Sequence, residues 1–396
     1  MITQTTLRER LMEHMQVLCK QIGARPTGTR AEQRAAEYVR QQLWALDVKD
    51  VREQPFETPR SLGYGVIPFL LAAALAVPLG RLGRLGKLLG GMTLLSAIYN
   101  LRELMMAKQP LSQPFMATAE SQNVIAVIPP RGETRQQLFI LAHLDSNKQR
   151  FMMPQPFPPL TRTINTFGLL LGGLAGVSLL WDALTGKREQ SNLQTAASMV
   201  TLGMLANAAI DEVQPYVEGA NDNASAVAVA LELAASLKVE PLEHTEVTLL
   251  FTGSEETACV GIEKYLEQYA PPQESSYWID LEMVGTGNLC YVTRHGLSKF
   301  SEYRPAPRIT AMAAKVARQR PELRVKGKPM TIVEEVAPLI RRGYEAICIA
   351  GYDELGMLPN WHRVSDTLDK IEPETMTRAH GYALALAQEI DRRTLD

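Results

Sequence analysis

Cysteine is scarce in this chain. Its 396 residues include four cysteines, Cys19, Cys259, Cys290 and Cys348, and no two of them form a CxxC pair. Widely spaced single cysteines are typical of reduced thiols. They argue against a disulfide framework and against a zinc site built on cysteine.

Neither sign of charge is in excess. The chain has 41 Lys and Arg residues against 43 Asp and Glu residues, and its pI is about 6.4. It therefore lacks the basic field that nucleic-acid binding requires. The first 30 residues also lack an apolar core of signal-peptide length and are typical of an amphipathic helix followed by a turn. We expect no nucleic-acid partner and no signal peptide, and a cytoplasmic or membrane-associated protein.

Short apolar segments of strand length alternate with helical patterns along much of the chain. The expected strands cover residues 48–56, 123–129, 137–144, 245–253, 276–284 and 345–352, and the expected helices cover 4–22, 30–47, 223–238, 263–270 and 375–392. Strands that are apolar throughout and interleaved with helices favour an α/β sheet covered on both faces. We expect a three-layer α/β/α domain with a mostly parallel mixed central sheet.

Two segments interrupt this alternation with long uncharged runs. Residues 61–80 and 88–101 flank a basic connector, and residues 163–181 and 191–210 flank a second connector, DALTGKREQ, that contains Lys187 and Arg188. Each pair is typical of a hydrophobic helical hairpin inserted into the α/β core. The expected organisation is an N-terminal core part (1–60), a first insertion (61–118), a core segment (119–147), a second insertion (148–215) and the rest of the core (216–396).

The insertions are candidates for contact with a membrane or with a second copy of the chain. Most of their uncharged runs approach the roughly 20 residues that span a bilayer. Against a membrane span, Pro68 and Pro78 interrupt the first run, and the run 88–101 is short. We expect membrane or homo-oligomer contact through 61–101 and 163–210. Because the second insertion separates two groups of polar candidates, we also expect it to border the functional site.

Acidic and histidine side chains gather where the expected strands end. They are His143, Asp145, Asp222, Glu255, Glu256, Glu282 and His362. Ligands in α/β sheets collect at the carboxyl ends of the strands, and imidazole and carboxylate groups both suit zinc. Taken singly, each residue has a simpler explanation, such as a helix cap or a hydrogen-bonded loop residue. Their joint placement predicts an open, catalytic metal site.

Five motifs make a family resemblance specific. AHLDS, GANDNASA, GSEE, DLEMVG and HRVSDTLDKI occur in this order. They resemble the metal-site motifs of the dinuclear zinc exopeptidases, which include aminopeptidase Y, bacterial leucyl aminopeptidases and glutamate carboxypeptidase, with glutaminyl cyclases as relatives. The likeness covers residues 1–57, 119–147 and 216–396. It implies a zinc-dependent exopeptidase that binds two zinc ions per chain and acts on peptides.

The resemblance also implies a role for each ligand. Asp222 would bridge the two zinc ions, Glu256 and His362 would bind one of them, and His143 and Glu282 would bind the other. The family usually has Asn-x-Asp-Met where this chain has DLEM. When the motifs are aligned on the methionine, Glu282 takes the ligand position, and Asp280 remains the alternative.

Glu255 and Asp145 receive the two supporting roles. Two neighbouring acids at the end of a strand point in different directions, so Glu256 can bind metal while Glu255 faces the attacking water. Glu255 would then accept the proton of that water and pass it to the leaving amine. Asp145 would orient the imidazole of His143.

The expected activity is that of an aminopeptidase. A carboxypeptidase or dipeptidase on the same site is the nearest alternative, and it would need an arginine near the metals; Arg294, Arg341 and Arg342 are the candidates. A glutaminyl-cyclase-like acyltransferase fits less well, because the set of ligands for two metals is complete. A non-catalytic membrane or interaction protein on a peptidase scaffold is the alternative from another class.

Overall fold

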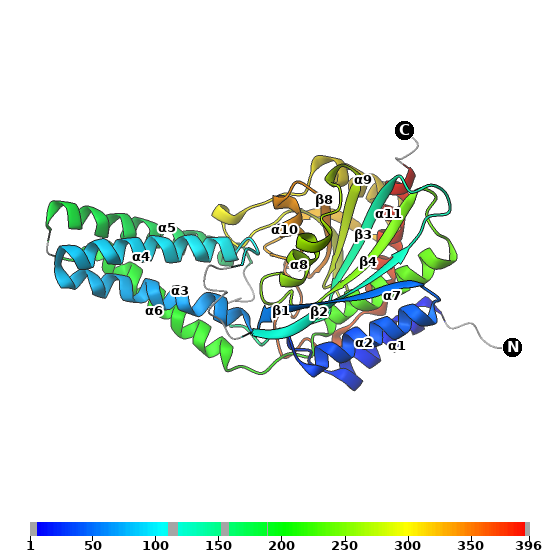
Figure 1. The fold of residues 1–396 in the computed structure, drawn as a ribbon, viewed down its shortest axis with the longest axis horizontal. Coiled ribbons are helices and arrows are strands. Elements are labelled where there is room, and N and C mark those ends of the chain that lie inside the picture. The colour runs from blue at the N-terminus through cyan, green and yellow to red at the C-terminus, as the bar shows by residue number, and fades with distance from the viewer. Residues whose placement is uncertain (1–5, 110–117, 152–157, 188, 393–396) are drawn as a thin grey trace.

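The computed structural model describes residues 6–109, 118–151, 158–187 and 189–392. In these ranges the chain forms an α/β domain from which long helices project at one end (Figure 1). The predicted three-layer α/β/α architecture is confirmed. Residues 4 and 5 of the first expected helix, residues 110–117 of the first expected insertion and residues 152–157 of the second lie outside the described residues. The division into core segments and insertions stays a prediction.

Eight strands of the described residues form one mixed sheet. They are β1 (Asp50–Pro59), β2 (Thr118–Ile128), β3 (Gln136–His143), β4 (Thr245–Thr252), β5 (Ser276–Glu282), β6 (Asn288–Arg294), β7 (Val325–Pro329) and β8 (Glu345–Tyr352). Their order across the sheet is β1-β2-β4-β3-β5-β8-β6-β7. The central neighbours β4, β3, β5 and β8 run parallel, and antiparallel pairs join them to β2 and to β6. Four carboxyl ends therefore meet at one edge, where sheets of this kind bind ligands.

Helices cover both faces of the sheet. One face carries α1 (Leu7–Gln16), α2 (Arg30–Ala45), α7 (Ser225–Val239), α9 (Pro307–Gln319) and α11 (Pro373–Arg392), and the other carries α8 (Val260–Tyr269) and α10 (Val336–Arg341). Side chains alternate along β3, so Leu138 and Ile140 enter the first core, whereas Phe139 and Leu141 enter the second. Burial on both faces explains why these strands are apolar throughout.

The two inserted segments form one bundle of four helices. Helices α3 (Leu62–Leu79) and α4 (Gly83–Leu104) make one hairpin, and α5 (Pro158–Thr185) and α6 (Asn192–Glu212) make the other. Helix α4 packs along α5 and α3 packs along α6, so the hairpins lie side by side (Figure 1). The sequence predicted the hairpins but not their union in one bundle.

Two helices of the bundle differ from expectation. Pro68 and Pro78 do not interrupt α3, and α4 extends beyond the expected run 88–101 at both ends. A Cβ on Gly90 would lie 2.2 Å from the carbonyl oxygen of Ala76, so only glycine allows α4 to approach α3 this closely.

Arg25 joins the N-terminal segment to the loops around the carboxyl edge of the sheet. Its side chain is buried and donates hydrogen bonds to the carbonyl oxygens of Leu18, Gly23, Leu144, Glu218 and Gly219. Its backbone N–H donates to Oγ of Ser146 at 2.9 Å. One guanidinium therefore satisfies buried backbone acceptors from three separate parts of the chain.

Replacement of Arg25 by Met is expected to lower the free energy of unfolding by about 2–4 kcal/mol, because several buried carbonyls lose their donors. Arg30→Met is the matched control, since Arg30 is exposed at the start of α2; it should change stability by less than about 0.5 kcal/mol. Chemical unfolding followed by circular dichroism measures both. Equal stability of the two variants would contradict this role of Arg25.

Candidate metal centre

The structure brings the predicted ligands together at the carboxyl edge of the sheet. His143 ends β3 and Glu282 ends β5, while Glu256 lies in the turn after β4. Asp222 lies in the loop that leads into α7, and His362 lies in the loop that follows β8. All five side chains are buried. Segments far apart in sequence therefore supply one compact cluster.

Asp222 is shared by two groups of three side chains. Its Oδ1 lies 3.2 Å from Nε2 of His143, which is 3.5 Å from Oε2 of Glu282. Its other oxygen, Oδ2, lies 3.3 Å from Nε2 of His362, which is 3.2 Å from Oε2 of Glu256. Each group offers one nitrogen and two carboxylate oxygens, all within 4.8 Å of one another. Asp222 thus presents a separate oxygen to each group.

The composition of the cluster fits zinc. Imidazole nitrogens and carboxylate oxygens are both zinc ligands, and three protein ligands per ion leave a coordination position open. Glu256 Oε1 has no hydrogen-bond partner among the described residues, although it is buried. A buried carboxylate oxygen without a donor is costly unless a cation lies nearby. The residues present therefore fit two divalent cations, one beside each histidine.

Charges within the cluster shift its pKa values strongly. Burial raises the pKa of Glu282 to about 7. Burial by itself lowers the pKa of His362, but Glu256 and Asp222 outweigh it and raise this pKa to about 9. Without a cation, the side chains of Glu282 and His362 thus bind protons more readily than usual, whereas metal ligands must be deprotonated. Cation binding at this cluster therefore competes with protons.

The two acids of the DLEM motif face different neighbours. Glu282 lies beside His143, and its Oε2 also accepts a hydrogen bond from Nδ2 of Asn223 at 3.2 Å. Asp280 instead groups with Glu334 and Cys348, and neither of its carboxylate oxygens has a hydrogen-bond partner among the described residues. The geometry therefore favours Glu282 over Asp280 as the ligand.

Asp145 supports the turn that carries the two adjacent glutamates. Its carboxylate accepts hydrogen bonds from the backbone N–H groups of Glu255, at 3.1 Å, and Glu256, at 3.2 Å. The hydroxyl of Thr27 donates to the same carboxylate at 2.7 Å. Nδ1 of His143 lies 3.4 Å from Oδ1 of Asp145. Asp145 therefore contacts the imidazole of His143, as expected, and also fixes the backbone at Glu255 and Glu256.

Glu255 differs from its neighbour in exposure. It is partly exposed, whereas Glu256 is buried, and both line a cavity of about 90 Å³ together with Asp222, Glu282 and His362. Burial among these groups raises the pKa of Glu255 well above its usual value. This carboxylate therefore faces the space into which the ligand cluster opens.

Asp366 holds the backbone that presents Asp222, a role that the sequence did not reveal. Its buried carboxylate accepts hydrogen bonds from the N–H groups of Asn221, at 2.7 Å, and Asp222, at 3.1 Å. The only sequence signal is its place in the motif HRVSDTLDKI, four residues after His362.

Asn147 is a second contact that the sequence did not reveal. Its Nδ2 donates to Oε2 of Glu256 and lies 3.3 Å from Nε2 of His362. Its Oδ1 accepts a hydrogen bond from Nε of Arg150 at 3.0 Å. The sequence signal for Asn147 is its position two residues after Asp145. Asn147 therefore links the ligand cluster to a neighbouring basic side chain.

The fold and the ligand cluster are of the kind expected for a metallo-exopeptidase. Residues 192–387, about half of the chain, match the family described as Peptidase family M28. The resemblance predicted from the five motifs is thereby confirmed, and the chain carries a peptidase domain of this family.

Known proteins with similar sequences or folds agree with this class. The probable lipoprotein aminopeptidase LpqL of Mycobacterium tuberculosis is 25% identical over 260 residues, which cover 58% of this chain and 51% of that protein. The aligned part thus spans about half the length of that relative. A zinc aminopeptidase from Bacillus subtilis has a similar fold, with a TM-score of 0.58 and 15% identity over 98% of this chain and 96% of that one.

Two further solved structures have the same fold. A Zn-dependent exopeptidase from Parabacteroides distasonis gives a TM-score of 0.56 at 16% identity, covering 97% of this chain and 98% of that one. A glutaminyl cyclase from Bacteroides thetaiotaomicron gives 0.57 at 15% identity, covering 98% and 99%. At this level of identity the likeness establishes the fold and leaves the specific reaction to the site.

Replacement of Asp366 by Ala is expected to weaken zinc binding about 10- to 100-fold, the usual effect of losing a group that orients a ligand. The backbone at Asp222 would lose its two hydrogen-bond acceptors. Asp369→Ala, an exposed acid three residues further on, is the control and should bind zinc as the parent does. Competition with a chromophoric chelator measures the affinity. Unchanged affinity in a folded Asp366→Ala protein would contradict this assignment.

Proposed function

We propose that this protein is a zinc-dependent aminopeptidase with two zinc ions, both of which Asp222 would help to hold. The observation that supports the proposal most directly is the division of the Asp222 carboxylate, with one oxygen beside His143 and the other beside His362. His143 and Glu282 would bind one ion, and Glu256 and His362 the other. When bound, zinc acidifies water and polarises the carbonyl group that is attacked.

The chain's own residues supply the proton transfer and the alignment. Glu255 would accept a proton from the attacking water and deliver it to the leaving amine, a role that requires a carboxylate facing the open part of the site. Asp145 would hold Glu255 in place by accepting a hydrogen bond from the backbone N–H of Glu255. The described loops that carry Asp222 and Glu256 are tied to buried partners, so the groups are positioned before substrate arrives.

The charge of the site favours a substrate with a free amino group. The residues that line the cavity at the metal centre include Asp222, Glu255, Glu256 and Glu282, and none of these lining residues is a lysine or an arginine. Two bound zinc ions would offset the charge of these four carboxylates. The lining therefore offers no cationic side chain to pair with a terminal carboxylate, and a free amino end is the better fit.

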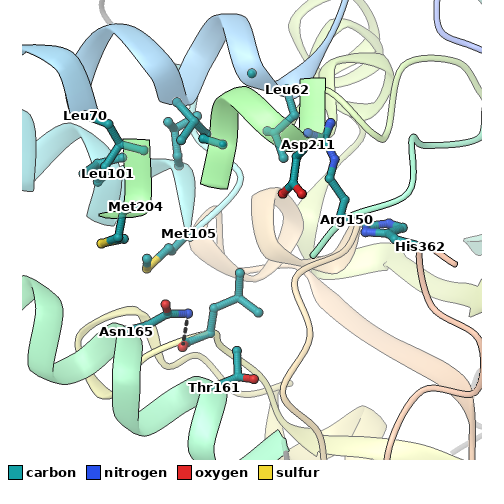
Figure 2. A pocket seen from close by; sticks show the side chains of 15 residues that line it. Leu62, Leu70, Leu101, Met105, Arg150, Thr161, Asn165, Met204, Asp211 and His362 are labelled. Carbon is teal, nitrogen blue, oxygen red and sulfur yellow. Dashed lines mark hydrogen bonds between the residues drawn. The ribbon is translucent and has the colours of Figure 1, made fainter. Parts of the chain in front are cut away.

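The arginines proposed for a carboxypeptidase are only partly consistent with that alternative. Arg341 and Arg342 form ion pairs with Glu263 on α8. Arg150, which the sequence did not single out, lines a neighbouring cavity beside His362 (Figure 2), and it pairs with Glu212 at 2.8 Å. Arg150 keeps a carboxypeptidase as the second candidate, because the terminal carboxylate of a substrate would compete with Glu212 for its guanidinium group.

Replacement of Glu255 by Gln is expected to leave two zinc ions beside Asp222 and to lower kcat by at least about 1,000-fold, since the amide cannot take the proton. Metal analysis and hydrolysis of leucyl anilide, with and without chelator, measure the two effects. Glu274→Gln, at an exposed position, is the control.

The same experiment separates the competing activities. If an N-acylated amino-acid substrate is cleaved faster than the leucyl anilide, the protein is a carboxypeptidase and not an aminopeptidase. Release of a cyclised product from an N-terminal glutaminyl peptide would indicate an acyltransferase. Loss of zinc from Glu255→Gln in parallel with activity would make Glu255 a ligand and overturn its role as proton acceptor.

We also propose that the four-helix bundle inserts into a membrane. Three helical stretches, Leu62–Leu104 (which includes α3 and α4), Leu160–Thr185 and Asn192–Glu212, are long and apolar enough to cross a bilayer. Only 39%, 33% and 22% of their most apolar windows are buried within the protein. Large apolar side chains such as Leu75 and Leu174 are therefore left exposed on the bundle surface.

Charge is confined to the two ends of the bundle. Residues 62–79, 88–101, 163–181 and 192–210 contain no charged side chain. Near the start of α4 and the end of α5, Lys87 is buried and forms an ion pair with Asp182 at 3.7 Å. The uncharged segments are about 20–28 Å long at 1.5 Å per residue, close to the 30 Å hydrocarbon core of a bilayer. An apolar band between polar ends is the pattern expected of a membrane-embedded bundle.

The full chain is therefore expected to float with liposomes in a density gradient and to resist extraction by alkaline carbonate. A triple substitution of Leu75, Leu89 and Leu174 by Asp should release the protein from the membrane, because each charge in the hydrocarbon costs about 2.5–3.5 kcal/mol. The matched control replaces Val239, Leu355 and Val364 by Asp. These residues are exposed on the α/β domain, so this variant should still float. A parent protein that is a monodisperse dimer without detergent would instead favour contact between two copies.

A further inference from the structure

A second group of metal-binding side chains lies next to Glu282, on one face of the sheet. Asp280 is two residues before Glu282 on β5, so the two side chains point to the same face. Cys348 is the neighbour of Asp280 on the adjacent parallel strand β8. Glu334 lies just before α10, which covers this face. A carboxylate oxygen of Asp280, one of Glu334 and the sulfur of Cys348 lie within 4.8 Å of one another.

The acids of this group are buried among other acids. Asp280 and Glu334 are each 1% exposed, and Glu335, which follows Glu334, is fully buried. Burial raises the pKa of Asp280 well above its usual value, and the charges of Glu335 and Glu282 raise it further. Within the described ranges, no lysine or arginine forms an ion pair with Asp280, Glu334 or Glu335. Buried charges of one sign are costly unless a cation compensates them.

Protonation alone does not satisfy these side chains. Neither carboxylate oxygen of Asp280 has a hydrogen-bond partner among the described residues, and Oε1 of Glu335 has none either. A protonated Asp280 would gain an O–H donor, which also needs a partner when it is buried. Asp280 is therefore unsatisfied in either protonation state, whereas a cation between Asp280 and Glu334 would pair with both carboxylates.

The set of donor atoms suits zinc. Zinc binds thiolate sulfur and carboxylate oxygen, and a thiolate ligand disfavours the hard cations magnesium and calcium. Burial raises the pKa of the Cys348 thiol well above its usual value. A cation would therefore displace the proton of this thiol, as cations do from coordinating thiols. The scarcity of cysteine argued against a site made of several thiolates, and this group needs only one.

Two buried side chains hold the carboxylate of Glu334. The hydroxyl of Tyr303 donates to its Oε2 at 3.0 Å, and Nδ1 of His295 lies 2.5 Å from its Oε1. The rings of Tyr303 and His295 stack, with centroids 4.9 Å apart. Each carboxylate oxygen has two lone pairs, so Glu334 can keep both contacts and still bind metal. Outer contacts that orient a ligand in this way are typical of metal sites.

We propose that Asp280, Glu334 and Cys348 bind a third zinc ion, separate from the two beside Asp222. The geometry favours Glu282 as a ligand of those two ions and leaves Asp280 for the third. The third ion joins the loop before α10 to β5 and β8, and it compensates the buried acids next to Glu282. The proposal does not depend on which substrate the enzyme cleaves.

The test compares two buried cysteines. Cys348→Ala removes the sulfur ligand. Cys290→Ala is the matched control, because Cys290 is equally buried, lies in the same apolar core and belongs to β6, the strand next to β8. The full-length proteins are loaded with zinc and dialysed, and their metal content is measured by mass spectrometry. Cys348→Ala should hold one zinc ion per chain fewer than the parent, and Cys290→Ala should hold as many as the parent.

Cobalt reports the type of ligand. Bound to a thiolate, Co²⁺ has an intense charge-transfer absorption in the near ultraviolet, which nitrogen and oxygen ligands do not give. The ligands proposed beside Asp222 include no cysteine, so this absorption reports the third site alone. We expect it in the cobalt-loaded parent and in Cys290→Ala, and we expect Cys348→Ala to lack it.

Two results would overturn the proposal. One is equal zinc content in the parent and in a folded Cys348→Ala protein, and the other is a cobalt-loaded parent without the thiolate absorption. If Cys348→Ala does not fold, Glu334→Gln replaces it, since it removes a charged ligand with little change of shape and should also lose one ion.

The cobalt measurement also separates this proposal from the proposed function. A parent that shows the thiolate absorption but cleaves no anilide would contradict only the aminopeptidase assignment. A parent that cleaves leucyl anilide without showing the absorption would contradict only the third zinc site.

Discussion

The electrostatic problem of burying several carboxylates at one edge of the sheet dominates the organisation of this protein. Asp222, Glu256 and Glu282 are buried within reach of two imidazoles, and like charges at such distances repel strongly in a poorly solvated site. The proposed zinc ions would resolve that repulsion. The supporting contacts follow from the same constraint, because backbone N–H groups and the side chain of Asn147 hold the acids in one arrangement before any cation is bound.

The α/β domain and the bundle meet at the site, and each contributes something the other lacks. The parallel strands supply rigid positions for the ligands, since β3 and β5 end at His143 and Glu282. The bundle supplies apolar surface, which the acidic edge of the sheet cannot offer.

Much of the fold could be predicted from the sequence, because its strands are buried on both faces and carry unbroken apolar runs. The strands β6 and β7 were missed for physical reasons. β7 reads VKGKP, is largely exposed and carries glycine and proline, and β6 reads NLCYVTR, in which only the four residues LCYV form an apolar run. Helix α9 was also missed, although Ile309, Met312 and Val316 form a buried helical stripe that the sequence does carry.

The candidate site was predictable only as far as its motifs reach. The ligand candidates could be named because each lies in a short segment with a family likeness, and the structure brings them into one cluster. The supporting roles of Arg25, Asn147 and Asp366 could not be found in this way, although Asp366 lies in one of the motifs, since each acts on backbone or side chains distant in sequence. Such contacts depend on tertiary structure, and a motif does not say which contacts its residues make.

The placement of the first hairpin between β1 and β2 has a consequence for any topology in a bilayer. These two strands pair over their full length, from Asp50 opposite Val127 to Pro59 opposite Thr118, although α3 and α4 separate them in the chain. An odd number of crossings between them would leave the two partners in different compartments and make that pairing impossible. The pairing of β1 with β2 therefore requires an even number of membrane crossings between them. If the chain leaves one compartment after β1, it must return to that compartment before β2 begins.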